Sequence, residues 1–246
     1  MCGDAIYKYI LNKCIHLLDF MGDKIKRTGD TSDLILQKLL QAIVDRSLTA
    51  GQPIRETQLA KEWGVSRTPV REAIRSAATM GLIEIRHNQR PLVKNFGQKD
   101  LVKLTDVRVV IELLAFDHSI NSLMGSKKVK NLLVKAMELE NPHESSLFTK
   151  KALQLDTSFH RLWVDTCDNQ FIVLAFESLW TFIRMLQRTA ANDLNRAVTA
   201  LSEHNAILRA IDEGDKNIAR RLLEEHLRSS TPILERLLKK QNEEND

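Results

Sequence analysis

The chain has 246 residues, of which 43% are hydrophobic and 28% charged, and its formal net charge is +4 at pH 7. This length suits one large domain or two small ones, and so small a net charge excludes a uniformly basic coat protein, so any nucleic-acid site must be a local patch. The three cysteines are widely spaced and odd in number, which indicates a reducing compartment without a disulfide framework. No apolar run approaches the roughly 20 residues of a membrane-spanning helix, so we expect a cytoplasmic protein with no membrane partner.

Residues 1–30 are interpreted as an N-terminal extension. Its stretch YKYILNKCIHLLDF is interrupted by Lys8, Lys13 and His16, and no small-residue cleavage site follows, which argues against a signal peptide. Two interpretations stay open. The extension is either a docking helix or a disordered or mis-assigned start, with Met21 as the true first residue.

Residues 31–96 predict a small domain of three helices and a hairpin. Apolar residues at helical spacing and the breaks between them place the helices at residues 32–47, 56–63 and 66–80. Gly64 supplies the turn after the second helix, Ser66 is the expected cap of the third, and Gly81 closes it. Residues 82–93 alternate around a polar tip, as in a β-hairpin. This order of elements is that of a winged helix-turn-helix domain.

Residues 98–240 predict an all-α domain. The helices are expected at 98–124, 127–139, 145–167, 169–190, 194–213 and 215–241. A sharp break falls at NPHE, residues 141–144, and Gly214 followed by Asp215 reads as a C-cap followed by an N-cap. We therefore predict a mainly α fold, in which an N-terminal winged helix-turn-helix domain precedes an all-helical bundle.

The start of the third helix carries the residue types that contact DNA. Arginine pairs with the O6 and N7 atoms of guanine, hydroxyl groups fix phosphates, and a helix N-terminus favours anions. Arginines on a helix are usually just a solvated face, but the surrounding order of elements favours the DNA-binding interpretation over that one. The candidate DNA-binding residues are Arg55, Ser66, Arg67, Thr68, Arg71, Arg75 and His87.

A second constellation combines one carboxylate with three imidazoles. Asp156 and His160 are four residues apart and share a helix face. His204 lies ten residues before Gly214 and His226 twelve after it, so both stand at the same height in an antiparallel helix pair. These four ligands suit zinc, nickel or manganese, and open coordination positions would accept a ligand carboxylate. Isolated histidines are more often packing or surface residues, and that interpretation is kept for His16, His118 and His143.

The sequence resembles a known family in both halves. IRETQLAKEWGVSRTPVREAIRSAATMGLIEIR resembles the DNA-binding domain of GntR-type transcription regulators of the FadR branch. The resemblance implies that Arg67 and Arg71 contact bases or phosphates. The family's wing usually carries glycines at its tip, whereas this chain has HNQR, which leaves His87 as the best wing candidate.

The span from about residue 98 to 237 resembles the all-helical ligand-binding domain of that branch, the FCD domain. Its metal-binding members carry Asp-x-x-x-His on one helix and single histidines on two later helices, a pattern that this chain matches residue by residue at Asp156, His160, His204 and His226. DVRVVIELLA resembles the first helix of that domain, where an arginine at the place of Arg108 often faces the ligand pocket. The resemblance therefore implies that Arg108 is an effector-binding residue.

These features predict a transcription regulator that is not an enzyme. We expect it to bind a palindromic double-stranded DNA operator as a homodimer and to sense a small organic acid at a metal site. Two alternatives stay open. One is a metal-free regulator that senses a long acyl-thioester. The other is a metal-dependent hydrolase, which lacks a signature such as HExxH, and for which Glu203 and Glu225 are expected on faces away from the histidines.

Overall fold

The computed structural model describes residues 31–139 and 146–243, with a few side chains in this range left out. The contacts divide the chain after Phe96 into two compact units, which are described separately. The N-terminal extension and the NPHE break lie outside the described residues.

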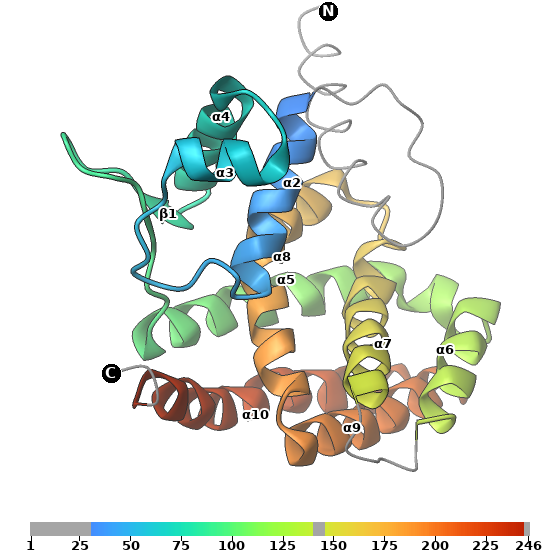
Figure 1. The fold of residues 1–246 in the computed structure, drawn as a ribbon. Coiled ribbons are helices and arrows are strands. Elements are labelled where there is room, and N and C mark those ends of the chain that lie inside the picture. The colour runs from blue at the N-terminus through green and yellow to red at the C-terminus, as the bar shows by residue number, and fades with distance from the viewer. Residues whose placement is uncertain (1–30, 140–145, 244–246) are drawn as a thin grey trace, which may run out of the picture. The chain divides into compact units, whose positions relative to one another are not determined.

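The N-terminal unit contains the predicted three helices and hairpin. Its elements are α2 (Thr31–Val44), α3 (Glu56–Trp63), α4 (Arg67–Thr79), β1 (Ile83–Glu84) and β2 (Leu92–Val93) (Figure 1). Helix α2 packs along α4, where Val70, Ile74 and Ala77 are all buried. Gly64 adopts a left-handed conformation with φ 68°, which glycine reaches at no steric cost, and so lets α3 turn directly into α4.

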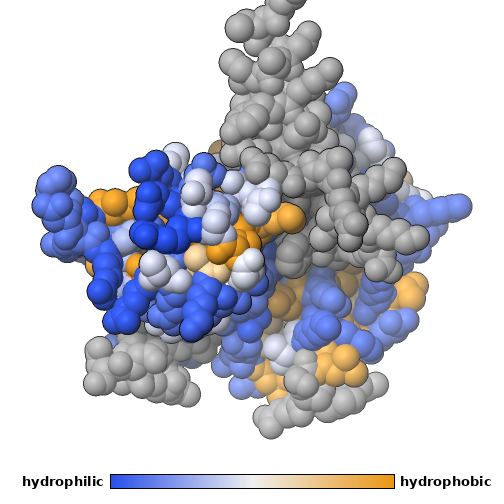
Figure 2. Space-filling model, turned by 45° about the horizontal axis from the view of Figure 1, so that its top comes forward, coloured by the Kyte–Doolittle hydropathy of each residue, from blue (hydrophilic) through white to orange (hydrophobic). Residues whose placement is uncertain are grey.

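The wing is a short antiparallel pair in which Ile83 lies opposite Val93. Its strands are only two residues long, shorter than the alternation over residues 82–93 suggests, because the chain leaves the ladder after Glu84 to form the exposed tip. The backbone of Gly51 also donates to the carbonyl of Val93 at 2.8 Å, which ties the preceding loop to the wing. The exposed residues 85–90 project as an arm with a hydrophilic surface, seen at the left in Figure 2.

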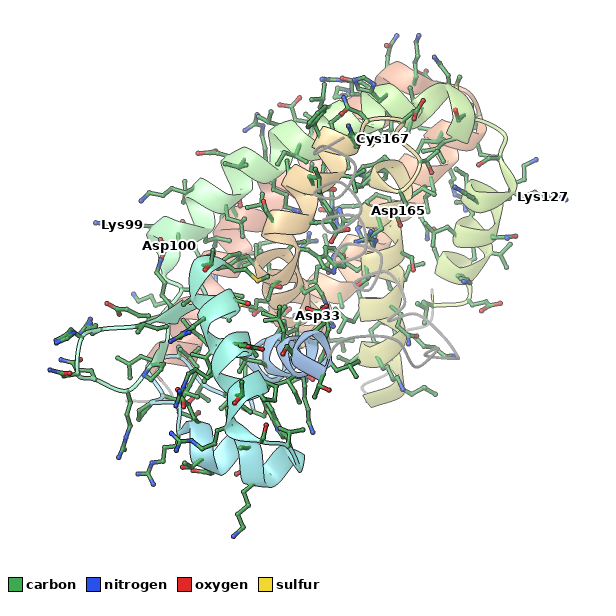
Figure 3. The ribbon with its side chains drawn as sticks, turned by 90° about the horizontal axis from the view of Figure 1, so that it is seen from above. Asp33, Lys99, Asp100, Lys127, Asp165 and Cys167 are labelled. Carbon is green, nitrogen blue, oxygen red and sulfur yellow. The ribbon has the colours of Figure 1, made fainter. Side chains whose placement is uncertain are left out.

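The C-terminal unit confirms the predicted all-α bundle. Its helices are α5 (Gln98–Leu123), α6 (Lys127–Met137), α7 (Ser146–Val164), α8 (Gln170–Ala191), α9 (Leu194–Asp212) and α10 (Lys216–Glu243). The clearest difference from the prediction is at the end of α7, which stops at Val164 rather than at residue 167. There the amide of Cys167, labelled in Figure 3, donates to the carbonyl of Trp163 in a turn. Asn169 then caps α8 by accepting from two backbone amides.

Helix α7 lies at the centre of this unit, since it packs against α5, α6, α8 and α9. Its buried aromatic residues Phe159 and Trp163 meet edge to face and form the core together with Phe116 of α5. Helices α9 and α10 run side by side (Figure 1). They are joined at Gly214, with φ 84°, and at Asp215, whose carboxylate accepts from the amide of Ile218 at 3.0 Å. The predicted cap pair is therefore confirmed, and it sets His204 and His226 at the same height.

None of the helices within the described ranges is long and apolar enough to cross a membrane.

Candidate metal centre and DNA-binding surface

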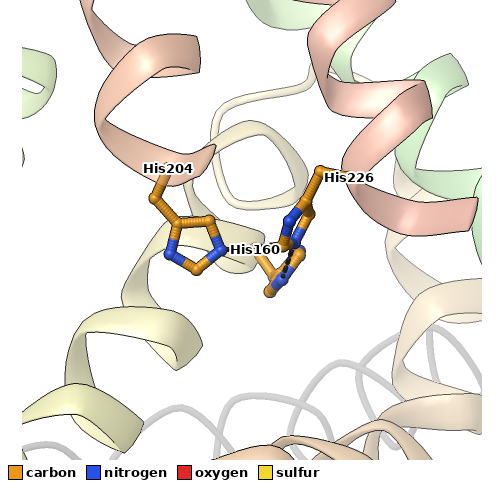
Figure 4. A group of neighbouring side chains, drawn as sticks. All are labelled: His160, His204 and His226. Atoms are coloured by element: carbon orange, nitrogen blue, oxygen red, sulfur yellow. Dashed lines mark hydrogen bonds between the residues drawn. The ribbon is translucent and has the colours of Figure 1, made fainter. Parts of the chain in front are cut away.

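Three buried histidines meet where α7, α9 and α10 come together (Figure 4). The Nε2 atom of His226 lies 3.2 Å from that of His204 and 3.3 Å from that of His160. The Oδ1 atom of Asp156 lies 3.5 Å from His204 Nε2 and 3.7 Å from His160 Nε2. The fold thus brings together the four residues that the sequence pattern singled out.

These spacings match a metal coordination shell. Zinc with ligands at about 2.0–2.1 Å in a tetrahedron places the ligand atoms about 3.3–3.4 Å apart. The four spacings of 3.2–3.7 Å surround that value. Among the described residues, the buried Oδ2 atom of Asp156 has no hydrogen-bond partner, which is costly for a carboxylate oxygen unless a cation balances it.

The orientation of His160 is fixed by a chain of contacts to α5. His160 Nδ1 donates to Glu112 Oε2 at 2.8 Å, and Trp163 Nε1 donates to the same oxygen at 3.2 Å. Arg108 Nε donates to the other oxygen, Glu112 Oε1, at 2.6 Å. All of these side chains are buried. The charge of Glu112 is therefore paired with Arg108, while its second oxygen holds the imidazole.

A parallel chain fixes His226 from α9. His226 Nδ1 donates to Glu203 Oε2 at 2.6 Å, and Arg196 Nη1 donates to that oxygen at 3.0 Å. The arginine is buried, whereas the Glu203 side chain is 27% exposed. Each of these two histidines thus belongs to an Arg–Glu–His chain, the arrangement by which proteins commonly orient metal-ligating imidazoles.

These chains decide the protonation of the inner nitrogens. A carboxylate only accepts hydrogen bonds, so the Nδ1 atoms of His160 and His226 carry the protons in the neutral rings. Their Nε2 atoms, 3.3 Å apart, are then both acceptors and cannot hydrogen-bond to each other. Two lone pairs that face one another inside a buried site are stabilised by a cation between them.

The electrostatics of the site favour neutral imidazoles. Burial lowers the pKa of His160 and His204 well below the usual value and also lowers that of His226. Burial raises the pKa of Asp156 to about 6. Burial also raises the pKa of Glu203, but its bonds to His226 and Arg196 outweigh this effect, so that the net pKa is lowered. At neutral pH the site therefore offers three neutral imidazoles and one carboxylate.

A small cavity opens beside the triad, between α7, α8 and α9. Its volume is about 20 Å³, room for one water molecule. The hydroxyl of Thr157 donates to Gln187 Oε1 at 3.3 Å, and Gln187 Nε2 has no partner among the described residues. The cavity is lined by Ala152, Asp156, Gln187, Ala190, Ala191, Ala197, Ala200, Leu201 and His204.

The candidate DNA-binding residues lie on the surface of the N-terminal unit. Ser66 occupies the N-cap position of α4 with extended backbone angles, but its side chain makes no cap hydrogen bond within the described unit. Helical spacing places Arg67, Arg71 and Arg75 on one exposed stripe, opposite the buried one. Exposed side chains are found at all seven candidates, Arg55, Ser66, Arg67, Thr68, Arg71, Arg75 and His87.

Comparison with family models settles the family. Residues 31–93 match the model of the bacterial regulatory proteins of the gntR family, and residues 103–229 match the model of the FCD domain. The chain belongs to the GntR family and carries an FCD domain. As a member of this family it is a DNA-binding transcription regulator, and its C-terminal unit is a ligand-binding domain.

The curated relatives of this GntR regulator are named as transcription regulators too. A probable D-xylose utilization operon transcriptional repressor of Paenarthrobacter nicotinovorans is 27% identical, over 87% of this chain and 93% of the relative. The solved structure of E. coli McbR/YncC has a TM-score of 0.70 at 19% identity and covers 84% of this chain and 98% of that one. The Zn²⁺-bound FCD domain of TM0439 has a TM-score of 0.50 at 19% identity and covers 58% of this chain and 96% of that one. The structures show a shared fold, and the curated relatives are transcription regulators rather than enzymes.

The FCD domain departs from the sequence interpretation at Glu203 and adds Glu112, which the interpretation missed. The expectation that Glu203 lies away from the histidines is wrong, because it faces His226 across the helix pair. Glu112 is absent from the predicted set, although its place on the buried stripe of α5, four residues after Arg108, marks it as unusual. Arg108 is buried and turned to Glu112 through Nε, while its Nη2 has no partner among the described residues.

Proposed function

We propose that this GntR regulator binds a divalent transition metal in its FCD domain and that a small organic acid, held at that metal, controls its affinity for operator DNA. The observation that carries the proposal is the convergence of three imidazole nitrogens, unprotonated in His160 and His226, and one carboxylate oxygen at spacings of 3.2–3.7 Å in a buried site. Fold stability does not require such a donor set, because apolar residues of similar volume would fill the same space at a lower desolvation cost.

The metal would be held by Asp156, His160, His204 and His226. Zinc accepts these four ligands in a tetrahedron and would expand to five-coordinate to take an oxygen of the acid, whereas nickel or manganese would keep open positions. The zinc-bound FCD domain of TM0439 supports zinc as the first metal to test. The bound ion would supply a positive anchor for an anionic oxygen of the ligand.

The charges around the site support an acid as the effector. Each Arg–Glu pair is neutral as a unit, the three imidazoles are neutral, and Asp156 carries one negative charge. A divalent cation leaves the centre with a net charge of about +1, which one carboxylate neutralises. Sugar acids, hydroxy acids and dicarboxylates are therefore the effectors to screen. Arg108 is a candidate donor through Nη2, which has no partner within the described ranges.

The complete ligand set separates this proposal from its main alternative, because a regulator without a metal has no use for four convergent donor atoms. The cavity beside the triad, about 20 Å³ and walled by alanines, has room for one metal-ligated water. Every organic effector is larger than this cavity, so its size does not distinguish an acid from a long acyl-thioester.

On the DNA side, we propose that two copies of the chain form a homodimer and bind a palindromic operator. The start of α4 would enter the major groove, where Arg67 and Arg71 read or position bases, while Arg55, Ser66, Thr68, Arg75 and the wing residue His87 contact the backbone. Two recognition helices must reach grooves about one helical turn apart or a multiple of it, so a small change in their placement on effector binding alters operator affinity.

The test begins with selection of binding sequences from randomised double-stranded DNA. Fluorescence anisotropy then measures the Kd for the selected site at fixed salt, because phosphate contacts make every affinity salt-dependent. The zinc-loaded protein should prefer a palindrome, and at least one organic acid should change its Kd fivefold or more. An acid effect that persists in metal-stripped protein, or no effect across the panel, would contradict the metal-linked mechanism.

A further inference from the structure

The carboxylate of Glu56, the first residue of α3, lies between two arginines of α4. Arg71 donates to Glu56 Oε2 through Nη2 at 3.0 Å and through Nε at 3.1 Å. Arg67 Nη2 lies 3.6 Å from the same oxygen. The Glu56 side chain is only 21% exposed, whereas that of Arg71 is 48% exposed. One partly buried acid thus holds the arginine that the DNA-binding surface presents to solvent.

What an arginine side chain can bind depends on which edge of its guanidinium group is already occupied. Arginine has a side edge, formed by Nε and one Nη nitrogen, and an end edge, formed by the two Nη nitrogens. Glu56 occupies the side edge of Arg71. The end edge remains for another acceptor pair, and the O6 and N7 atoms of guanine are such a pair.

From this geometry we propose that Glu56 is a positioning residue for sequence recognition, which locks Arg71 so that its end edge reads one guanine in each half-site. The inference rests on the proposed entry of α4 into the major groove. Glu56 itself touches no base, and it acts only through the arginine.

Two physical arguments support this role over a simple ion pair. Exposed pairs stabilise a fold little, so stability alone does not explain an acid at this place. An acid on a DNA-binding surface also repels phosphate, which lowers the affinity for every sequence. The arginine hydrogen bonds lower the pKa of Glu56, so it is charged at neutral pH and exerts this repulsion. A pre-organised arginine loses less freedom when it binds and so favours the sequence that offers the matching acceptors.

The decisive variant is Glu56→Gln, and Glu62→Gln on the same helix is its matched control. Both remove one negative charge, but Glu62 is exposed and accepts from Gln58 at 2.8 Å, whereas both arginines pair with Glu56. For each protein, anisotropy gives the ratio of the Kd for scrambled DNA to the Kd for the selected operator at one salt concentration. We expect the ratio to fall about tenfold in Glu56→Gln and to hold within about twofold in Glu62→Gln.

Selection from randomised DNA identifies the base involved. Glu56→Gln should lose the preference at one position of each half-site, and Arg71→Lys, which keeps the charge but has no fork, should lose it at the same position. Circular dichroism shows whether Glu56→Gln folds. If it does not, Arg71→Lys tests the same contact through the arginine.

Each remaining outcome overturns the proposal in a distinct way. Tighter binding of Glu56→Gln to all sequences at an unchanged ratio would show that Glu56 only competes with DNA for the arginines. Loss of different positions in the Glu56 and Arg71 variants would show that the two do not act together. A wild-type protein that selects no sequence at all would remove the proposed recognition role of α4 itself.

Discussion

Glu112 on α5 accepts a hydrogen bond from His160 Nδ1 on α7 at 2.8 Å, and this contact turns His160 Nε2 towards the other two histidines. The same oxygen accepts from Trp163, and Arg108 neutralises the carboxylate from one turn earlier. The orientation of a proposed metal ligand is thereby set by α5, the helix that follows the division between the two units.

Replacement of Glu112 or Glu203 by glutamine should weaken metal binding by 10- to 100-fold, because the imidazole loses its fixed tautomer and part of its basicity. Competition against a chromophoric zinc chelator at pH 7.5 measures the effect. Glu225→Gln is the matched control, since Glu225 directly precedes His226 in the chain but, within the described ranges, pairs with Arg221 at the surface. Equal zinc affinity in all three variants and the wild type would show that the carboxylates do not orient the ligands.

Metal affinity should depend on pH through Asp156. Its pKa is raised to about 6, whereas burial lowers those of His160 and His204 well below the usual value, so the carboxyl group takes up a competing proton before these two imidazoles as pH falls. Above pH 6 Asp156 is charged and the affinity should be nearly constant. Below pH 6 it should fall about tenfold per pH unit, because each bound metal must then displace one proton.

Asp156→Asn has no proton to lose at that position. It should bind zinc more weakly at neutral pH and lose the fall in affinity that begins near pH 6 in the wild type. Isothermal titration at several pH values tests both proteins, and a wild-type affinity that falls already between pH 8 and 7 would point to a histidine instead.

Ser66 should matter for DNA and little for stability. Its side chain makes no cap hydrogen bond in the described unit, so Ser66→Ala should change the free energy of unfolding by less than about 0.5 kcal/mol. Asn169 caps α8 through the amides of Phe171 and Ile172, and Asn169→Ala should cost roughly 1 kcal/mol. Chemical denaturation compares the two.

For operator affinity, we expect Ser66→Ala to have the larger effect and Asn169→Ala the smaller. Ser66→Ala removes a candidate phosphate contact and should weaken binding several-fold, whereas Asn169→Ala should leave the Kd at low temperature unchanged. A Ser66 variant with wild-type affinity would place the N-terminus of α4 away from the phosphates.

The sequence predicts the elements well because their signals are local. Periodicity and caps place the helices, and the position of His204 and His226 around Gly214 correctly predicts their approach across the helix pair. The supporting contacts are harder to predict, because they join residues far apart in the chain. His160 meets Glu112 and His226 meets Glu203 only after the bundle closes, so no spacing rule reveals these pairs. Likewise, Glu56 reads as an ordinary first-turn acid of α3 until α4 packs beside it.

The most direct test of the metal-linked account is the metal content of the purified protein by mass spectrometry, for the wild type beside His204→Ala and His118→Ala. His204 is buried in the triad, whereas His118 is an exposed histidine on α5. We predict about one metal per chain in the wild type and in His118→Ala, and a large loss in His204→Ala. Wild-type protein that holds no metal even after loading at neutral pH, or a His204 variant that keeps it, would contradict the account and leave the histidines with a structural role.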